Sequence, residues 1–198
     1  MNLRRFNEMT KLAGRRLVQS PLEFRSFLEF ADAYFKSRSI LKPIIVEVGT
    51  AYNAQKPFYQ ELLNGEYIGI DLGYQPYKDR EVRFCPNIVG NSHSPETVEK
   101  LKKWLGGRLI DLLFIDADHS YESVKLDYEI YDPFVKHIVA FHDIYSHDPG
   151  SPLRCGVRPF WNELVAKERV LPMVMFKMGD CPPGRSFQMG IGLIIKGG

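Results

Sequence analysis

Residues 114–121, Phe-Ile-Asp-Ala-Asp-His-Ser-Tyr, gather two carboxylates, an imidazole, a hydroxyl and a phenol directly after an apolar run. The imidazole of His119 can take a proton from a hydroxyl, because the ordinary pKa of histidine is close to neutral. The carboxylate of Asp116 can bind a divalent cation, and that of Asp118 can cap the following helix. The segment is therefore a candidate active centre for acid–base or metal chemistry.

A second polar pair, His142 and Asp143, follows the next apolar run of the chain. If the two runs are neighbouring parallel strands, their carboxyl ends bring Asp116 and Asp143 close enough to share a cation. The catalytic candidates are therefore Asp116, His119 and Asp143, and the metal-ligand candidates are Asp116, His142 and Asp143. The structural alternative is that residues 118–120 only cap a helix and form local hydrogen bonds.

The elements that must position these residues alternate between short apolar runs and amphipathic stretches. The predicted strands span residues 43–49, 67–71, 111–115 and 138–141, with a short edge strand within 79–90 and a terminal hairpin of 172–177 and 189–195. The predicted helices span residues 20–36, 54–63, 94–104, 120–131 and 160–167, and residues 179–185 form a loop. This order predicts a three-layer α/β fold with a seven-stranded, mostly parallel sheet and an antiparallel edge strand.

Serine residues mark the starts of three predicted helices. Ser20, Ser94 and Ser120 can each accept a hydrogen bond from the first helical turn, and Glu23 can complete a capping box with Ser20. Right-handed crossovers between the parallel strands place ligand sites at the carboxyl ends of the strands.

The turn after the first predicted strand, Glu-Val-Gly-Thr-Ala-Tyr-Asn at 47–53, has features of a nucleotide-binding turn. Gly49 allows the backbone to approach a ligand, and free N–H groups of the next helix can bind a carboxylate or phosphate. Asp71 ends the second strand 22 residues after Gly49, near the spacing at which an acid binds a ribose diol. The turn lacks the other glycines of a dinucleotide fingerprint, so an ordinary tight turn is the alternative.

Length and composition indicate one globular domain, residues 1–198, with residues 1–40 as a helical N-terminal cover and 41–198 as a Rossmann-like core. The formal net charge of +2 does not indicate a nucleic-acid partner. The sequence shows neither an apolar run that would span a bilayer nor a signal-peptide core, so a soluble cytoplasmic protein is expected. Three widely spaced cysteines fit no disulfide framework or zinc motif and are interpreted as reduced thiols: Cys85, Cys155 and Cys181.

The N-terminal segment is locally basic. It carries Arg4, Arg5, Lys11, Arg15 and Arg16 against the single acid Glu8. A transit peptide or an anion-binding arm are alternatives, but Phe6, Met9, Ala13 and Leu17 have helical spacing, which favours an amphipathic helix. Three isolated histidines are interpreted as surface or loop residues: His93, His137 and His147.

These motifs resemble those of the class I S-adenosylmethionine-dependent methyltransferases, in the branch of cephalosporin-hydroxylase-like and macrocin-type O-methyltransferases. The resemblance covers about residues 40–195, and residues 114–121 are its most specific part. Residues 47–50 look like the cofactor motif, Asp71 like the ribose-binding acid, and residues 90–97 like the segment that lines the adenine.

The resemblance implies methyl transfer to an oxygen acceptor, with S-adenosylmethionine as donor and S-adenosylhomocysteine as product. It also implies that Asp116 and Asp143 bind Mg²⁺ or another divalent cation and that His119 is the general base. The implied cofactor contacts are Glu47, Gly49, Thr50, Ala51, Asp71, Asn91, Ser92 and Asp116. The chain departs from the family pattern at Ala51 and Asn53 in place of glycine, at Asn91 in place of aspartate, and at His142 in place of an acid.

The sequence therefore predicts a cytoplasmic O-methyltransferase that acts on a small-molecule or sugar hydroxyl, with neither a nucleic-acid nor a membrane partner and with a homo-oligomer allowed. Aromatic residues at 52, 121, 145 and 187 favour a sugar or ring-containing acceptor, although core packing explains them equally well. Three other classes stay open. They are a metal-dependent hydrolase that uses Asp116, His119 and Asp143, an NAD-type oxidoreductase, and a non-catalytic cofactor-binding module.

Overall fold

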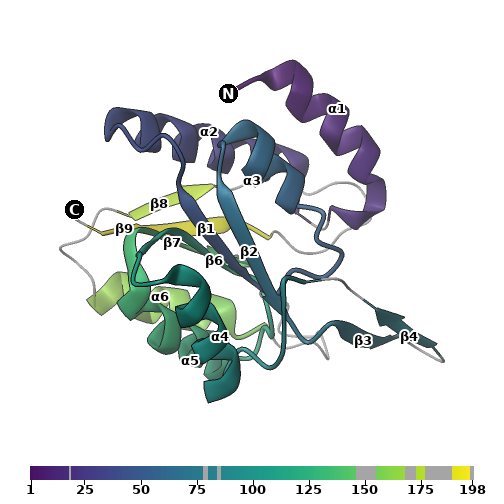
Figure 1. Ribbon diagram of the computed structural model, residues 1–198, viewed down its shortest axis with the longest axis vertical. Coiled ribbons are helices and arrows are strands. Elements are labelled where there is room, and N and C mark those ends of the chain that lie inside the picture. Colours follow the sequence, from purple (N-terminus) through teal and green to yellow (C-terminus); the bar gives the residue numbers. More distant parts are fainter. Residues whose placement is uncertain are drawn as a thin grey trace.

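At the centre of the structure, a computed structural model, lies a seven-stranded sheet with helices on both faces (Figure 1). The structure describes residues 1–17, 19–77, 80–83, 86–145, 155–167, 173–176 and 189–196. In spatial order the strands are β5 (Ile88–Val89), β2 (Glu66–Asp71), β1 (Ile44–Val48), β6 (Ile110–Ile115), β7 (Val135–His142), β9 (Ile191–Ile195) and β8 (Met173–Phe176). The predicted loop at 179–185 and the interpretations of Cys85, Cys181, His147 and Phe187 lie outside the described residues.

One strand near the edge of the sheet is antiparallel to both of its neighbours. β5, β2, β1, β6 and β7 pair in parallel, whereas β9 pairs antiparallel with both β7 and β8. The predicted seven-stranded, mostly parallel sheet with an antiparallel edge is therefore confirmed. The antiparallel strand β9 lies one place in from the edge, and its pairing with β8 forms the predicted terminal hairpin.

The short edge strand predicted within residues 79–90 is confirmed as β5, but the same region also contains a second strand that the sequence did not predict. β4 (Arg80–Arg83) pairs with β3 (Tyr74–Tyr77) in a separate two-stranded antiparallel sheet, and only β5 joins the main sheet. Pro86 lies between β4 and β5 and has no N–H to donate to a strand ladder, which explains why one strand does not continue through it.

β1 is a central strand, and all of its residues are buried. Its branched apolar side chains pack on both faces, as a parallel strand between two helical layers requires. Val48 pairs with Ile115 of β6, and the N–H of Asp116 donates to the Val48 carbonyl at 2.8 Å. The polar residues that follow β6 therefore begin directly beside the turn that follows β1.

Two helical layers cover the sheet (Figure 1). One layer contains α1 (Leu3–Ala13), α2 (Pro21–Ser37) and α3 (Lys56–Leu62), and the other contains α4 (Pro95–Leu105), α5 (Tyr121–Tyr131) and α6 (Val157–Lys167). Aromatic rings of each layer pack against the sheet. The ring centroid of Phe27 in α2 lies 5.4 Å from that of Phe114 in β6, and the centroid of Phe160 in α6 lies 6.0 Å from that of Phe141 in β7. The predicted helices are all present, although α6 begins at Val157 rather than at residue 160.

The predicted amphipathic helix near the N-terminus is confirmed as α1, which buries Phe6 and Met9. It ends at Ala13, and Leu17 is buried beyond its end. The ring of Phe6 packs against Phe58 of α3 at a centroid distance of 5.4 Å. α1 therefore covers α3 through an apolar face.

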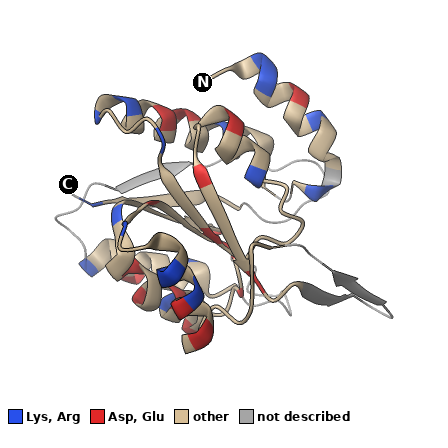
Figure 2. Ribbon diagram, in the orientation of Figure 1, with Lys and Arg blue, Asp and Glu red and all other residues tan. Residues whose placement is uncertain are grey.

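Acidic neighbours partly neutralise the basic side chains of α1. The Arg5 guanidinium lies 2.7 Å from Glu61 of α3 and 3.4 Å from Glu8. Along α1 and α2, Lys and Arg are interspersed with Asp and Glu (Figure 2). None of the described helices is both long enough and apolar enough to cross a membrane.

The serine caps are confirmed at two of the three predicted helix starts. Ser94 accepts from the N–H of Thr97, and Ser120 accepts from the N–H of Ser123. The capping box at the third start is wrong, because the Ser20 side chain makes no capping hydrogen bond there. The Glu23 carboxylate instead accepts from the N–H of Gly190, just before β9, at 2.9 Å.

The turn after β1 has an unusual backbone. Gly49 has a φ of +85°, and a Cβ at this position would lie 2.2 Å from the carbonyl oxygen of Asp116. Ala51 and Asn53, which stand where the resembling family has glycine, have φ values of +44° and +57°. L-residues rarely adopt this region, so the turn at Ala51 is strained.

We expect Ala51→Gly to raise the free energy of unfolding by about 0.5–1 kcal/mol. Relief of the left-handed strain, about 1–2 kcal/mol, outweighs the entropy cost of a new glycine, about 0.4–1 kcal/mol. Urea denaturation measures the change. Ala54→Gly is the matched control, since Ala54 is not among the residues of positive φ, and it should lower the free energy of unfolding. An equal loss in both variants would show that the turn is unstrained.

Candidate active site

A cavity of about 510 Å³ lies at the carboxyl ends of β1, β2 and β6. Cavities of this size suit a small molecule or cofactor. All the predicted cofactor contacts except Glu47 line it: Gly49, Thr50, Ala51, Asp71, Asn91, Ser92 and Asp116. His93, from the segment expected to line the adenine, also lines the cavity, as do Arg16, Gln19 and Ser123, which no sequence motif indicated.

Asp71 is held against the turn after β1. One carboxylate oxygen accepts from the N–H groups of Thr50 and Ala51, at 2.9 and 3.0 Å, and the other accepts from the N–H of Gly73 at 3.0 Å. Each carboxylate oxygen can accept further hydrogen bonds. Asp71 therefore both fixes the turn and offers acceptors at the cavity wall.

Glu47 lies behind the turn and is fully buried. Its carboxyl group contacts the Tyr67 hydroxyl at 2.5 Å, and the same hydroxyl lies 2.9 Å from the side-chain oxygen of Asn53. Burial raises the pKa of Glu47 well above its ordinary range, despite the hydrogen bond with Tyr67. Through the Tyr67 hydroxyl, the Glu47 side chain links the end of β1 to the last residue of the turn.

A buried acid supports the segment that follows β5. The Asp127 carboxylate of α5 is fully buried and lies 3.1 Å from Nε2 of His93, which lines the cavity. Burial raises the pKa of Asp127 above its ordinary range. The Tyr131 hydroxyl donates to the Ser92 carbonyl at 2.7 Å, and the Asn91 side chain accepts from the N–H of His93 at 2.9 Å. His93 therefore lies in a loop, as predicted, but it is not isolated.

The Asp116 carboxylate is the centre of the polar cluster. One oxygen lies 3.2 Å from Nε2 of His119 and 3.1 Å from Nδ1 of His142, and the other accepts from the Gln19 amide at 2.6 Å. Burial alone would raise the pKa of Asp116, but the two imidazoles hold it well below its ordinary value. Asp116 is therefore ionised, and the predicted meeting of residues from β6 and β7 is confirmed.

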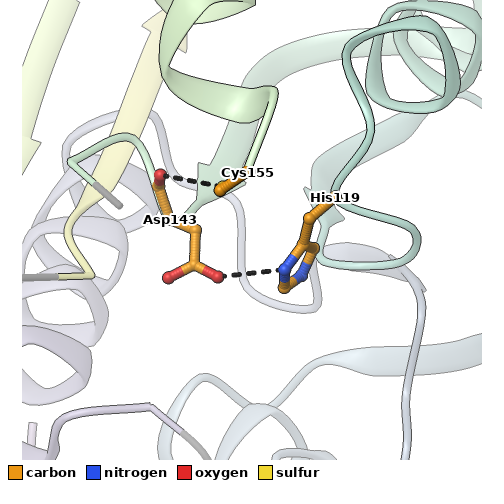
Figure 3. A group of neighbouring side chains, drawn as sticks. All are labelled: His119, Asp143 and Cys155. Carbon is orange, nitrogen blue, oxygen red and sulfur yellow. Dashed lines mark hydrogen bonds and ion pairs between the residues drawn. The ribbon is translucent and has the colours of Figure 1, made fainter. Parts of the chain in front are cut away.

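His119 lies between two carboxylates. Its Nδ1 is 3.2 Å from Asp143 (Figure 3), its Nε2 faces Asp116, and 41% of its side chain is exposed. Burial lowers the pKa of His119, but the hydrogen bond with Asp116 and the charges of Asp116 and Asp143 raise it above the ordinary histidine value. The ring is thus oriented by the protein while remaining accessible from solvent.

His142 is the buried imidazole of the cluster, with 2% of its side chain exposed. Burial disfavours its charged form, but Asp116 and Asp143 raise its pKa to about 9. Its Nε2 has no hydrogen-bond partner among the described residues. Asp143 follows with a φ of +62°, a left-handed conformation that turns the chain directly after β7.

Asp116, His142 and Asp143 can together hold a metal ion, because one ligand atom from each lies within 4.8 Å of the other two. Carboxylates and imidazole are suitable ligands for divalent cations, so the donor set fits. His142 must release a proton before its nitrogen can bind a cation. The three side chains therefore fit a divalent ion, but the proton on His142 competes with the ion for the imidazole nitrogen.

The structural alternative for residues 118–120 is confirmed for two of the three. Asp118 accepts from the N–H of Ser120 at 2.7 Å, and Ser120 caps α5. His119 instead belongs to the acid–base cluster.

The region also contains Gln19 and Cys155. Neither belongs to a sequence motif that would have predicted its place here. Their partners are Asp116 and the main chain of Asp143, and both contacts depend on tertiary folding.

His137 is a strand residue and not a surface or loop residue. It lies in β7, is 4% exposed, and has Nε2 3.7 Å from Asp111. Burial lowers its pKa below the ordinary histidine value. The prediction failed because β7 begins at Val135, directly after a 3₁₀ turn, and so includes residues that the sequence assigned to the connection.

Residues 55–144 match the family model of a methyltransferase domain. No curated protein matches the chain.

Solved structures resemble the fold at low sequence identity. The O-methyltransferase TomG from Streptomyces achromogenes, in complex with S-adenosylmethionine, has 14% identity and a TM-score of 0.59, over 97% of this chain and 89% of TomG. An O-methyltransferase from Bacillus cereus, in complex with S-adenosylhomocysteine, has 14% identity and a TM-score of 0.55, over 96% of this chain and 90% of that one.

The methyltransferase MycE of mycinamycin biosynthesis, with Mg and S-adenosylhomocysteine, has 16% identity and a TM-score of 0.54 over 85% of this chain. The match spans about half of MycE, 49% of its length. Identities this low show a shared fold. Residues 55–144 thus match a methyltransferase domain by sequence, and the chain has the fold of the class I S-adenosylmethionine-dependent methyltransferases.

Proposed function

We propose that this chain is an S-adenosylmethionine-dependent O-methyltransferase that acts on a hydroxyl group of a small molecule. The observation that carries the proposal is the position of Asp116, which lines the cavity and also hydrogen-bonds to His119. The cavity and the acid–base cluster therefore share a wall. A methyl donor bound in the cavity would lie next to a base, which is the arrangement that methyl transfer to a hydroxyl requires.

The cofactor residues are proposed to act through hydrogen bonds at the cavity wall. S-adenosylmethionine supplies an already activated methyl group, so the chain has only to align donor and acceptor. Asp71 accepts from the ribose hydroxyls, and the Asn91 side chain accepts from the adenine amino group. Gly49 permits close approach of the backbone, and Glu47 supports the turn from behind without lining the cavity.

His119 is proposed as the general base. When neutral, it donates from Nε2 to Asp116 and leaves Nδ1 to take the acceptor's proton. Asp143, 3.2 Å from Nδ1, then stabilises the imidazolium that forms. Because two carboxylates raise the pKa of His119, the neutral base form predominates only above the ordinary histidine pKa.

A divalent cation at Asp116, His142 and Asp143 is proposed to assist by polarising the acceptor oxygen. The donor spacing supports this part of the proposal, as does the presence of Mg in the MycE structures.

The acceptor is proposed to be a small molecule with a ring or sugar. A MycE structure contains mycinamycin VI, which supports this class of acceptor. Tyr121 packs on Phe160 of α6, and neither Tyr121 nor Tyr145 lines the cavity, so the aromatic residues do not themselves support this class of acceptor. Residues 1–198 are proposed to form one cytoplasmic methyltransferase domain that binds no nucleic acid and that can form a homo-oligomer.

A metal-dependent hydrolase is the second candidate, because the same three ligands could activate water. Formation of product in the absence of any methyl donor would distinguish this activity from methyl transfer.

We expect Asp71→Asn to weaken S-adenosylhomocysteine binding about tenfold to hundredfold, since a hydrogen bond to a charged group contributes about 1.5–3 kcal/mol. Isothermal calorimetry measures the change, and thermal unfolding checks that the variant is folded. Glu122→Gln, which removes an exposed carboxylate outside the cavity, should bind like the parent protein. Binding of NAD without binding of S-adenosylhomocysteine would favour an oxidoreductase.

We expect His119→Ala to lower the methyl-transfer rate at least about a hundredfold, while the affinity for S-adenosylhomocysteine stays close to that of the parent protein. Mass spectrometry of hydroxyl-bearing small molecules incubated with the donor measures the rate. In the parent protein the rate should rise with pH and level off above about 6.5, the ordinary histidine pKa. Equal losses of rate and cofactor affinity would assign His119 a structural role instead.

We expect chelation of divalent ions to lower the methyl-transfer rate at least about tenfold, because a metal ion that polarises the acceptor contributes several kcal/mol. The assay follows the protein after dialysis against excess chelator and again after Mg²⁺ is restored. Recovery with Mg²⁺ supports the metal site. Full activity in excess chelator would remove the metal from the proposed mechanism.

A further inference from the structure

The main chain fixes Cys155 beside His119. The N–H of Gly156, just before α6, donates to the His119 carbonyl at 2.6 Å. A Cβ on Gly156 would lie 2.1 Å from the main-chain nitrogen of Tyr121, so only glycine permits this approach. The loop before α6 and the turn after β6 are therefore held together by their backbones, next to the acid–base cluster.

Three side chains with different kinds of metal-ligand atom meet beside this loop. Nδ1 of His119 lies 3.2 Å from the Asp143 carboxylate, and the Cys155 thiol donates to the Asp143 carbonyl at 3.9 Å (Figure 3). One ligand atom from each of the three side chains lies within 4.8 Å of the other two. Thiolate, imidazole and carboxylate are the ligands of tetrahedral zinc sites, whereas Mg²⁺ prefers oxygen ligands alone.

A second carboxylate orients the imidazole for this role. Asp116 lies 3.2 Å from Nε2 of His119 and is itself held by Gln19 at 2.6 Å. Metal-binding histidines commonly donate their other N–H to a carboxylate, which fixes the ring and raises its basicity. With Nε2 bound to Asp116, Nδ1 faces Asp143 and is available to a cation.

We propose that His119, Asp143 and Cys155 form a binding site for a thiophilic divalent cation such as Zn²⁺, with a fourth position open to water. Binding displaces the thiol proton of Cys155. Asp143 also belongs to the Asp116, His142 and Asp143 group, so the two sites compete for one carboxylate.

Whether the cation site exists does not depend on the proposed function, but the effect of a bound cation on methyl transfer rests on that function. A cation on Nδ1 of His119 occupies the atom that takes the acceptor's proton. Zn²⁺ would therefore inhibit methyl transfer, whereas a hard cation bound at Asp116, His142 and Asp143 would leave the base intact.

Titration of the purified full chain with Co²⁺ alone tests the site. Cobalt replaces zinc in such sites, and a thiolate bound to Co²⁺ gives a charge-transfer absorption band in the near ultraviolet. We expect this band in the parent protein, its loss in Cys155→Ser, and at least about tenfold weaker binding in His119→Ala. Zn²⁺ should abolish the band by displacement.

Cys85→Ser and Cys181→Ser are the matched controls, since each removes one thiol elsewhere in the sequence, and both should keep the band. Absence of the band in the parent protein, its persistence in Cys155→Ser, or unchanged cobalt affinity in His119→Ala would overturn the proposal. Circular dichroism confirms that each variant is folded. Calorimetry with S-adenosylhomocysteine tests the proposed function separately, so failure of the zinc site leaves that result interpretable.

Discussion

The site depends on the Asp116 carboxylate, because a buried charge is stable only where hydrogen bonds and opposite charges replace water. Its partners, Gln19, His119 and His142, come from the segment before α2, the turn after β6 and the end of β7. One side chain thus joins the helices at the N-terminus to two strands of the sheet. Since Asp116 also lines the cavity, the cavity and the acid–base cluster lie side by side and share this carboxylate.

The sequence was sufficient to predict the features that follow from local chemistry. Buried apolar runs predicted the parallel strands, and Ser94 and Ser120 predicted two helix starts, because both kinds of signal depend on neighbouring residues. The topology of a parallel sheet then placed the polar residues that follow β6 and β7 at one edge, and Asp116 does contact His142 there. The turn at Gly49 and the acid at Asp71 were predicted in the same way, from a strand, its turn and the next strand.

Features that depend on contacts between distant segments could not be predicted. Gln19 reaches Asp116, Asp127 reaches His93, and Gly156 reaches the main chain of His119, in each case without a spacing that would indicate the contact. The capping box failed for the same reason, because Glu23 bonds instead to Gly190, far along the chain. Positive φ at Ala51 also contradicts the intrinsic preference of alanine, so the fold of the turn overrides a local propensity there, whereas asparagine, as at Asn53, tolerates this conformation.

We propose that the cavity and the acid–base cluster are one active site joined at Asp116. A crystal structure of the complex with S-adenosylhomocysteine tests this claim most directly. We expect the ribose hydroxyls to bond to Asp71 and the sulfur to point toward Asp116 and His119. A cofactor bound outside this cavity, or bound in it with the sulfur directed away from His119, would contradict the account.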